Sequence, residues 1–185
     1  MLKVDIKKLI TDEFEGMNVS VCANLPYYIT SPILMMLLES KLPIDAITVM
    51  VQKEAAKRIC ATEGTRDIGA ISMAVRYYSE PKLLFNVSRG SFMPAPDVDS
   101  AVIRLDIRKS PAVSVSDEDK FFKLIRGSFG QRRKTLANSL SSTLKLDKAD
   151  IYEALEKANI KQTARPEELT LLQFRDIFEN LSNKF

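Results

Sequence analysis

The sequence has no histidine, and its 185 residues include only six glycines and two cysteines. Without an imidazole, neither a Ser-His-Asp nor a Cys-His nucleophile system can be built, and a zinc site with histidine ligands is excluded. The glycines form neither a GxGxxG nor a GxxxxGK[ST] loop, so both common nucleotide-binding loops are missing. Cys22 and Cys60 lie outside any CxxC spacing, which favours two thiols in a reducing cytoplasm over a metal site or a disulfide framework. The chemistry of this chain therefore works without an imidazole base, and we expect no metal.

Long apolar runs are also lacking. The most apolar run, residues 33–38, is far too short to cross a bilayer. Residues 1–5 alternate in charge and form no apolar stretch, which argues against a signal peptide. The hydrophobic content of 45% and the charged content of 28% are typical of globular proteins. We therefore expect a globular, cytoplasmic protein without a membrane partner.

Basic residues are unevenly distributed, although the formal net charge is only +3. Between Lys120 and Leu146 the chain carries seven lysines and arginines and no aspartate or glutamate. Such a block suits a polyanion, and its binding would weaken as the salt concentration rises. A solvated helix face gives the same pattern, so the block alone leaves both interpretations open.

The first half of the chain alternates between strand-like and helix-like segments. Residues 19–23 predict a buried strand that stops at Asn24-Leu-Pro-Tyr. Ser31 and Pro32 predict the start of a helix, as N-cap residue and first-turn proline. The elements expected after this point are a helix at 33–40, a strand at 47–51, helices at 52–61 and 68–78, and strands at 83–87 and 101–107. This order favours the second half of a parallel, doubly wound sheet.

The second half of the chain is expected to be helical. Residues 109–116, with one proline and three serines, indicate a linker. Apolar residues then recur at helical spacing in four segments, at 117–129, 133–143, 147–157 and 167–181. The sequence therefore predicts an α/β part at residues 1–108 and a small all-α domain at residues 117–185.

The sharpest local feature is Asn24-Leu25-Pro26-Tyr27, at the predicted carboxyl end of a strand, where ligands bind in open α/β sheets. These residue types suit methylation of an exocyclic amine such as adenine N6, whose lone pair is delocalised into the ring. Hydrogen bonds from both amine protons, to the Asn24 side-chain oxygen and to a backbone carbonyl such as that of Leu25, would direct the lone pair at a methyl group. Pro26 stiffens the loop because it fixes φ, and Tyr27 can stack on a base extruded from RNA.

The tetrapeptide alone is weak evidence for this chemistry. A turn after a strand, with Asn and Pro as turn residues and Tyr as a core residue, has the same sequence. Methylation would not require a histidine, because an alkylated, cationic nitrogen loses its proton readily.

Four motifs occur in a fixed order along the chain. They are Asn24-Leu-Pro-Tyr-Tyr28, Val51-Gln-Lys-Glu-Ala-Ala-Lys-Arg58, Phe92-Met-Pro-Ala-Pro-Asp-Val-Asp-Ser-Ala-Val102 and Phe129-Gly-Gln-Arg-Arg-Lys-Thr135. In this order and spacing the sequence resembles the KsgA-type small-subunit (16S) rRNA adenine N6,N6-dimethyltransferases. The resemblance runs through nearly all of the chain.

The resemblance implies the C-terminal part of a Rossmann-like, S-adenosylmethionine-dependent methyltransferase domain, followed by a small all-α domain. It implies conversion of two adjacent adenines near the 3′ end of small-subunit rRNA to N6,N6-dimethyladenine, within the assembling 30S particle. By the family pattern Asn24 to Tyr27 hold the target adenine, Asn24 also borders the cofactor, and Phe92 is a second aromatic wall. The residues matching the family's rRNA-facing basic cluster are Gln131, Arg132, Arg133 and Lys134.

Structural roles remain open for these motifs. Phe92 could be a core residue before a proline-rich loop, although Pro94 and Pro96 beside it favour the functional role. The basic cluster could be a cationic turn at a helix end. Its arginines suit bidentate phosphate contacts, whereas its lysine is a mobile point charge.

The sequence departs from the family in one respect. The family's glycine-rich turn for the cofactor, and its acidic residues for the cofactor's ribose and adenine, have no counterpart here. Residues 1–5 resemble the stretch just after these features, so we expect the cofactor-binding N-terminal half to be absent. The strand at 19–23 would then lie at an exposed sheet edge. We expect the chain alone to be catalytically inactive or nearly so.

Three other functions are considered. A non-catalytic rRNA-binding or ribosome-assembly module would use the basic block without any chemistry. The related erythromycin-resistance methylases of large-subunit rRNA fit less well, because the basic cluster and the Asn-Leu-Pro-Tyr tetrapeptide match the small-subunit branch. DNA adenine methylases usually place an acidic residue or a second proline in the tetrapeptide.

Overall fold

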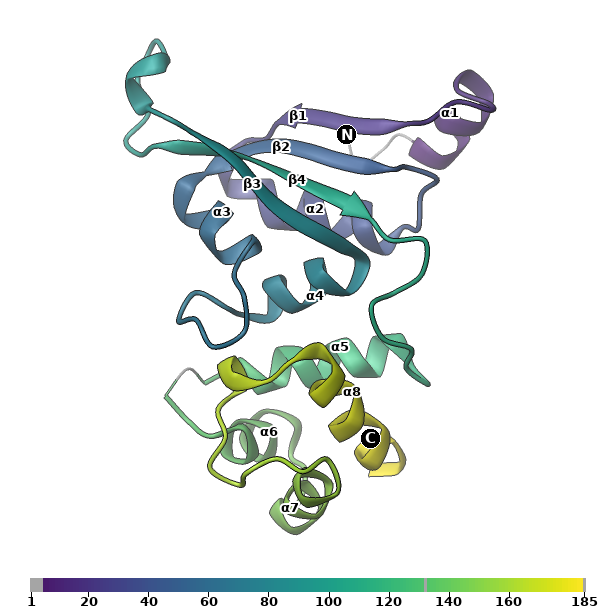
Figure 1. Cartoon of the computed structure of the whole chain (residues 1–185), viewed down its shortest axis with the longest axis vertical. Helices are drawn as coiled ribbons and strands as arrows, with labels where there is room; N and C mark the ends of the chain where they lie inside the picture. Colours follow the sequence, from purple (N-terminus) through teal and green to yellow (C-terminus); the bar gives the residue numbers. More distant parts are fainter. Residues whose placement is uncertain (1–4, 132, 185) are drawn as a thin grey trace. The chain divides into compact units, whose positions relative to one another are not determined.

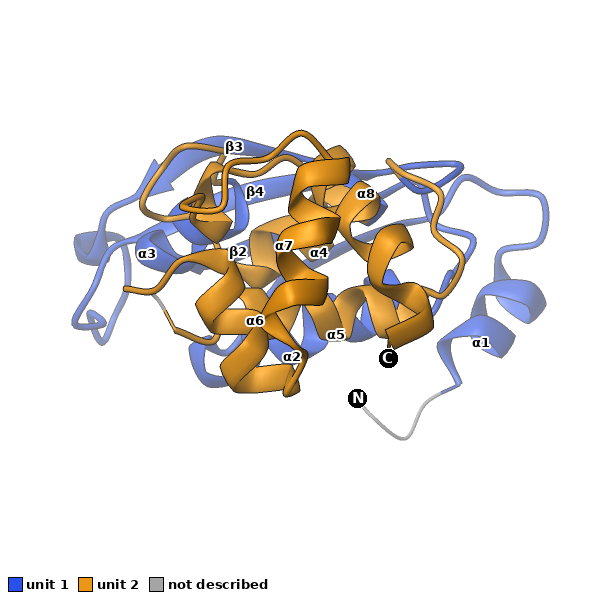
Figure 2. Cartoon of the chain, turned by 90° about the horizontal axis from the view of Figure 1, so that it is seen from below, with its two compact units in different colours: residues 1–60, 78–111 blue, residues 61–77, 112–185 orange. Residues whose placement is uncertain are grey.

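The computed structural model describes residues 5–131 and 133–184. The chain forms two compact units, each built from two stretches: residues 1–60 with 78–111, and residues 61–77 with 112–185 (Figure 2). The first unit contains a four-stranded sheet and the second is helical. The division into domains at 1–108 and 117–185 stays a prediction. The boundary between the compact units differs from the boundary between these predicted domains, because residues 61–77 group with the second unit.

The first unit is organised around a sheet with the strand order β1-β2-β4-β3 (Figure 1). Its strands are β1 (Ser20–Asn24), β2 (Ala46–Gln52), β3 (Ser79–Val87) and β4 (Ser100–Ile107). β1 and β2 pair in parallel, whereas β4 is antiparallel to both β2 and β3. The predicted α/β fold is confirmed, but parallel pairing among the described strands is limited to β1 and β2. A direct loop joins β3 to β4, and neighbouring strands joined in this way run antiparallel.

The core of the first unit lies on one face of the two central strands. Aliphatic residues alternate along β2 and β4, and those that face each other across the two strands are at most 1% exposed. The pairs are Ile47 with Leu105, Val49 with Ile103, and Val51 with Ala101. Helices α2 (Thr30–Glu39) and α3 (Lys53–Ile59) lie on the same side of the sheet in Figure 1. Their buried residues include Leu34 and Leu37 of α2 and Ala56 and Ile59 of α3.

The edge strands β1 and β3 are more exposed to solvent than the central strands β2 and β4. Exposed and half-buried residues alternate along β1, and no described strand pairs with its outer side. Three consecutive apolar residues of β3, Leu83, Leu84 and Phe85, are 48%, 46% and 57% exposed. Pro81 lies within β3, whereas the sequence predicted that the strand begins after it. An edge strand tolerates proline because one side of its backbone need not donate to a neighbour.

Helix α2 begins at Thr30, not at Ile33 as predicted. Its N-cap residue is Ile29, which supplies no side-chain cap. The prediction of Ser31 as N-cap is therefore wrong, because Ser31 already lies in the first turn. Pro32 is tolerated there because the first-turn N–H groups have no partner within the helix. Helix α1 (Ile6–Glu13), which the sequence did not predict, buries a single residue, Ile10.

The second unit is helical, as predicted. Its helices are α4 (Ala70–Tyr78), α5 (Glu118–Ser128), α6 (Leu136–Leu144), α7 (Lys148–Lys157) and α8 (Leu171–Leu181). Side chains of Asp117, Thr135, Asp147 and Thr170 cap the last four of these by accepting main-chain N–H groups. A short 3-10 turn (Pro166–Glu168) lies ahead of α8. None of the helices in the described part of the chain is long and apolar enough to cross a membrane.

An aromatic cluster forms the centre of the second unit. Phe121 lies 5.8 Å from Tyr77 and 5.6 Å from Phe178, measured between ring centroids. Tyr77 also meets Phe122 edge to face at 5.0 Å. Its hydroxyl donates to Glu118 Oε2 at 3.4 Å. Burial, with the neighbouring Glu118 carboxylate, raises the pKa of Tyr77 from 10.0 to about 12.

This raised pKa predicts a loss of stability at alkaline pH. The folded state binds the phenolic proton more tightly than the unfolded chain. The stability that the Tyr77 hydroxyl contributes to the fold is therefore fully present below its unfolded pKa near 10. It is lost as the pH rises towards about 12. Tyr77→Phe should reduce this alkaline loss. Urea denaturation of both proteins, below and within that pH window, measures the difference, and parallel pH profiles would contradict the assignment.

Candidate functional site

The tetrapeptide Asn24 to Tyr27 lies at the carboxyl end of β1, as predicted, and Asn24 is the last residue of the strand. The main-chain N–H of Leu25 donates to the Met50 carbonyl at 3.3 Å, which continues the pairing with β2 by one residue. Pro26 then turns the chain into a short 3-10 turn, Tyr27–Ile29. The Pro26 carbonyl accepts the Ile29 N–H at 3.1 Å and the Thr30 hydroxyl at 3.3 Å. Both ends of this loop are therefore fixed.

A depression of about 310 Å³ lies against this loop. Its lining combines the tetrapeptide with the segment between β3 and β4: Asn24, Leu25, Pro26, Tyr27, Phe92, Pro94 and Pro96. The structure thus brings together all five residues that the sequence placed around the adenine. Pro94 and Pro96, which were noted only as neighbours of Phe92, are also part of the wall.

A hydrogen bond joins the two sides of this depression. The hydroxyl groups of Tyr27 and Ser100 lie 2.7 Å apart, and Ser100 is fully buried. Ser100 begins β4 directly after the loop that carries Phe92. Ser100 lies within the third sequence motif, but its contact with Tyr27 could not be predicted because the two residues lie far apart along the chain.

The depression carries no charged side chain among its lining residues. Tyrosine, phenylalanine and proline form its walls, and Asn24 supplies an amide that can accept a hydrogen bond. Leu25, which also lines it, is 4% exposed. A flat, neutral heteroaromatic ring with an exocyclic amine suits such a site, because the ring can stack while the amine donates. No group of residues suited to a metal ion is found in the described residues.

The predicted basic cluster belongs to the second unit. Arg132 lies outside the described residues. Arg133 and Lys134 are exposed, and the Lys134 N–H donates to the Gln131 carbonyl at 3.0 Å in a turn. Gln131 is half-buried, and its side-chain amide donates to Ser142 Oγ at 2.7 Å. Gln131 therefore holds the turn in place, while Arg133 and Lys134 face solvent.

Arg66 and Arg165 were not singled out by the sequence. Both line a depression of about 260 Å³ in the second unit, which Gln131 also lines. They come from segments outside the basic block, so spacing along the sequence could not reveal this grouping.

Comparison with solved structures shows the class of fold. The chain resembles a dimethyladenosine transferase from Plasmodium falciparum, with a TM-score of 0.77 over 95% of this chain and 70% of that one, at 24% identity. It also resembles the 23S rRNA methyltransferase ErmE, with a TM-score of 0.63 over 94% of this chain and 69% of that one, at 24% identity. The first unit is thus part of a Rossmann-like fold.

Sequence comparison identifies the family within this class. The family model for ribosomal RNA adenine dimethylase matches residues 1–183, and the chain belongs to that family. Relatives named ribosomal RNA small subunit methyltransferase A include that of Alkaliphilus oremlandii, 50% identical over 185 residues, and that of Clostridioides difficile, 47% identical over 183 residues. These matches cover 100% and 99% of this chain but only 64% and 63% of the relatives. The chain thus spans less than two thirds of their length.

Proposed function

We propose that this chain is the adenine-binding part of a protein that converts two adjacent adenines near the 3′ end of small-subunit rRNA to N6,N6-dimethyladenine. The observation that carries the proposal is the shared depression of Asn24, Tyr27 and Phe92 at the carboxyl end of β1. Family membership and the names of the relatives support the choice of small-subunit rRNA over large-subunit rRNA.

In this proposal the chain prepares the target amine for alkylation. The Asn24 side-chain oxygen accepts one N6 proton, and the Leu25 carbonyl accepts the other. The Pro26 carbonyl is less suited to this role, because it already accepts two donors of the chain. Two acceptors on the amine favour a pyramidal nitrogen with its lone pair outside the ring system. Tyr27 and Phe92 hold the base in place by stacking, after it has left the RNA stack.

S-adenosylmethionine is the methyl donor that the family resemblance implies, and when bound it supplies the methyl group. The residues described here fit only the acceptor side of such a reaction. The sequence has no GxGxxG loop, and Asn24 is the one residue that we assign to the border of a donor site, at the end of edge strand β1. We therefore expect a complete donor site to require the part of the relatives that this chain does not span.

The RNA partner is proposed to be small-subunit rRNA in the assembling 30S particle, in the cytoplasm. Arg133 and Lys134 are exposed and suited to phosphate contacts, and Arg132 joins them in the sequence. Gln131 supports the turn that carries them. A second candidate function is a non-catalytic rRNA-binding module. The observation that favours it is the exposure of Arg133 and Lys134, which can contact phosphates without any chemistry.

A methylation assay tests the proposed activity. The chain would be compared with a version completed by the portion of the A. oremlandii relative that it does not cover. Both would be incubated with S-adenosylmethionine and unmethylated small ribosomal subunits, and N6,N6-dimethyladenosine would be measured by mass spectrometry of the digested rRNA. We expect product from the completed protein and little or none from the 185-residue chain. A completed protein that binds the subunits without forming product would favour the non-catalytic module.

A further inference from the structure

The loop that carries Phe92 connects two paired strands and is held at its ends. Val87 of β3 lies opposite Ser100 of β4, and residues 88–99 form the connection between them. Loops of this length between adjacent antiparallel strands are uncommon and are usually functional. Within it, a 3-10 turn (Arg89–Ser91) immediately precedes Phe92.

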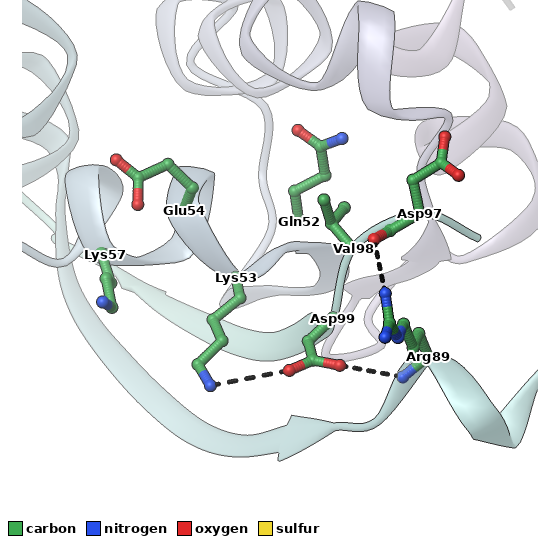
Figure 3. Close-up of a pocket in the computed structure, with 8 residues that line it drawn as sticks. All are labelled: Gln52, Lys53, Glu54, Lys57, Arg89, Asp97, Val98 and Asp99. Atoms are coloured by element: carbon green, nitrogen blue, oxygen red, sulfur yellow. Dashed lines mark hydrogen bonds and ion pairs between the residues drawn. The ribbon is translucent and has the colours of Figure 1, made fainter. Parts of the chain in front are cut away.

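Asp99, the last residue of this loop, is hydrogen-bonded to the beginning of the loop. Its Oδ1 accepts the main-chain N–H of Arg89 at 3.1 Å, and the Arg89 carbonyl accepts the N–H of Phe92 at 3.3 Å. Only two hydrogen bonds therefore separate the Asp99 carboxylate from the backbone of Phe92. The Arg89 guanidinium adds a contact of 3.2 Å to the Asp97 carbonyl (Figure 3).

Asp99 is in turn fixed to the start of helix α3. The main-chain N–H of Lys53 donates to the Asp99 carbonyl at 3.0 Å. The Lys53 ammonium lies 3.8 Å from Asp99 Oδ2, on the opposite side of the carboxylate from Arg89 (Figure 3). Both side chains of this ion pair are more than 40% exposed, so solvent screens it. The hydrogen bond to Arg89 is therefore the contact of the carboxylate that matters most for the loop.

We propose that Asp99 is a positioning residue for Phe92, and that it sets the distance of this aromatic wall from Asn24 and Tyr27. The inference rests on the proposed function, since the wall matters only if an adenine is held there. The Lys53 backbone holds Asp99 and the Tyr27 hydroxyl holds Ser100, so the start of β4 stays in place without the carboxylate. Loss of the carboxylate then removes the side-chain link between Asp99 and the turn at Arg89, and so loosens the position of Phe92.

The absence of tryptophan from the sequence allows a direct test. Phe92→Trp places a single fluorescent reporter in the loop, on which adenine can stack. In this background Asp99→Ala, Asp99→Asn and Lys53→Met are compared. Fluorescence anisotropy without ligand reports the mobility of the loop, titration with adenosine reports stacking, and urea denaturation reports the stability of the fold.

The Asp99→Ala variant should lower the anisotropy and weaken adenosine binding about fivefold to tenfold, which lies within the range for the loss of one ordinary solvent-exposed hydrogen bond. Asp99→Asn keeps an oxygen acceptor for Arg89 and should restore both signals, and Lys53→Met should change little. Unchanged anisotropy in Asp99→Ala would overturn the positioning role, as would an Asp99→Asn variant as mobile as Asp99→Ala. If adenosine binds to none of these proteins, the proposed function fails, while the ligand-free anisotropy still decides the role of Asp99.

Discussion

Asn24→Ala is expected to reduce methyl transfer by the completed protein about a hundredfold to a thousandfold, the range found when a single preorganised polar contact to a reacting group is removed. The mutation removes the side-chain acceptor for the N6 amine, so the lone pair stays delocalised into the ring. Binding of small ribosomal subunits should change little, because Asn24 is one contact among many. Product formation and subunit binding would be measured on the same preparation.

Asn86→Ala is the matched control for this prediction. Asn86 is an exposed asparagine of edge strand β3 in the same unit, and it does not line the adenine depression. Its replacement should leave methyl transfer unchanged. If Asn24→Ala retained turnover close to that of Asn86→Ala, the assignment of the amine acceptor would be wrong.

Phe121→Ala is expected to lower the free energy of unfolding by about 3–5 kcal/mol, the usual cost of removing a large buried aromatic side chain. Phe121 is completely buried and contacts the rings of Tyr77, Phe122 and Phe178. Its removal leaves a cavity among rings that come from α4, α5 and α8. Urea denaturation followed by circular dichroism measures the loss.

Leu172→Ala provides the comparison for an exposed apolar residue of the same unit. Leu172 is 52% exposed on α8, so its truncation should cost less than about 1 kcal/mol. A loss in Phe121→Ala no larger than in Leu172→Ala would mean that the aromatic cluster repacks without cost. It would then not be the centre of the second unit.

Much of the local structure could be predicted from the sequence, because the signals were local. The strands expected at 47–51 and 101–107 correspond to β2 and β4, and the segment with apolar residues at helical spacing at 147–157 corresponds to α7. The start of α2 was misplaced because a serine before a proline is a strong cap signal, yet the chain enters that helix directly from the 3-10 turn at Tyr27. Tertiary context outweighed the cap preference.

The candidate site was only partly predictable. Asn24 to Tyr27 and Phe92 could be found because each lies in a motif that resembles a known family. Ser100 and Asp99 act through partners distant in sequence, Tyr27 and Arg89, and single-residue patterns carry no information on such pairs. The grouping of Arg66 and Arg165 in one depression could not be predicted for the same reason, because the two residues are distant in sequence.

The measurement that tests the central claim most directly is a titration of the 185-residue chain with adenosine and with purine riboside, which lacks the 6-amine. Binding can be followed by NMR, because the method detects weak ligands and needs no methyl donor. The account predicts that adenosine binds more tightly than purine riboside and that Asn24→Ala removes the difference. Equal affinity of the unaltered chain for both nucleosides would contradict the claim that this site recognises the adenine N6 amine.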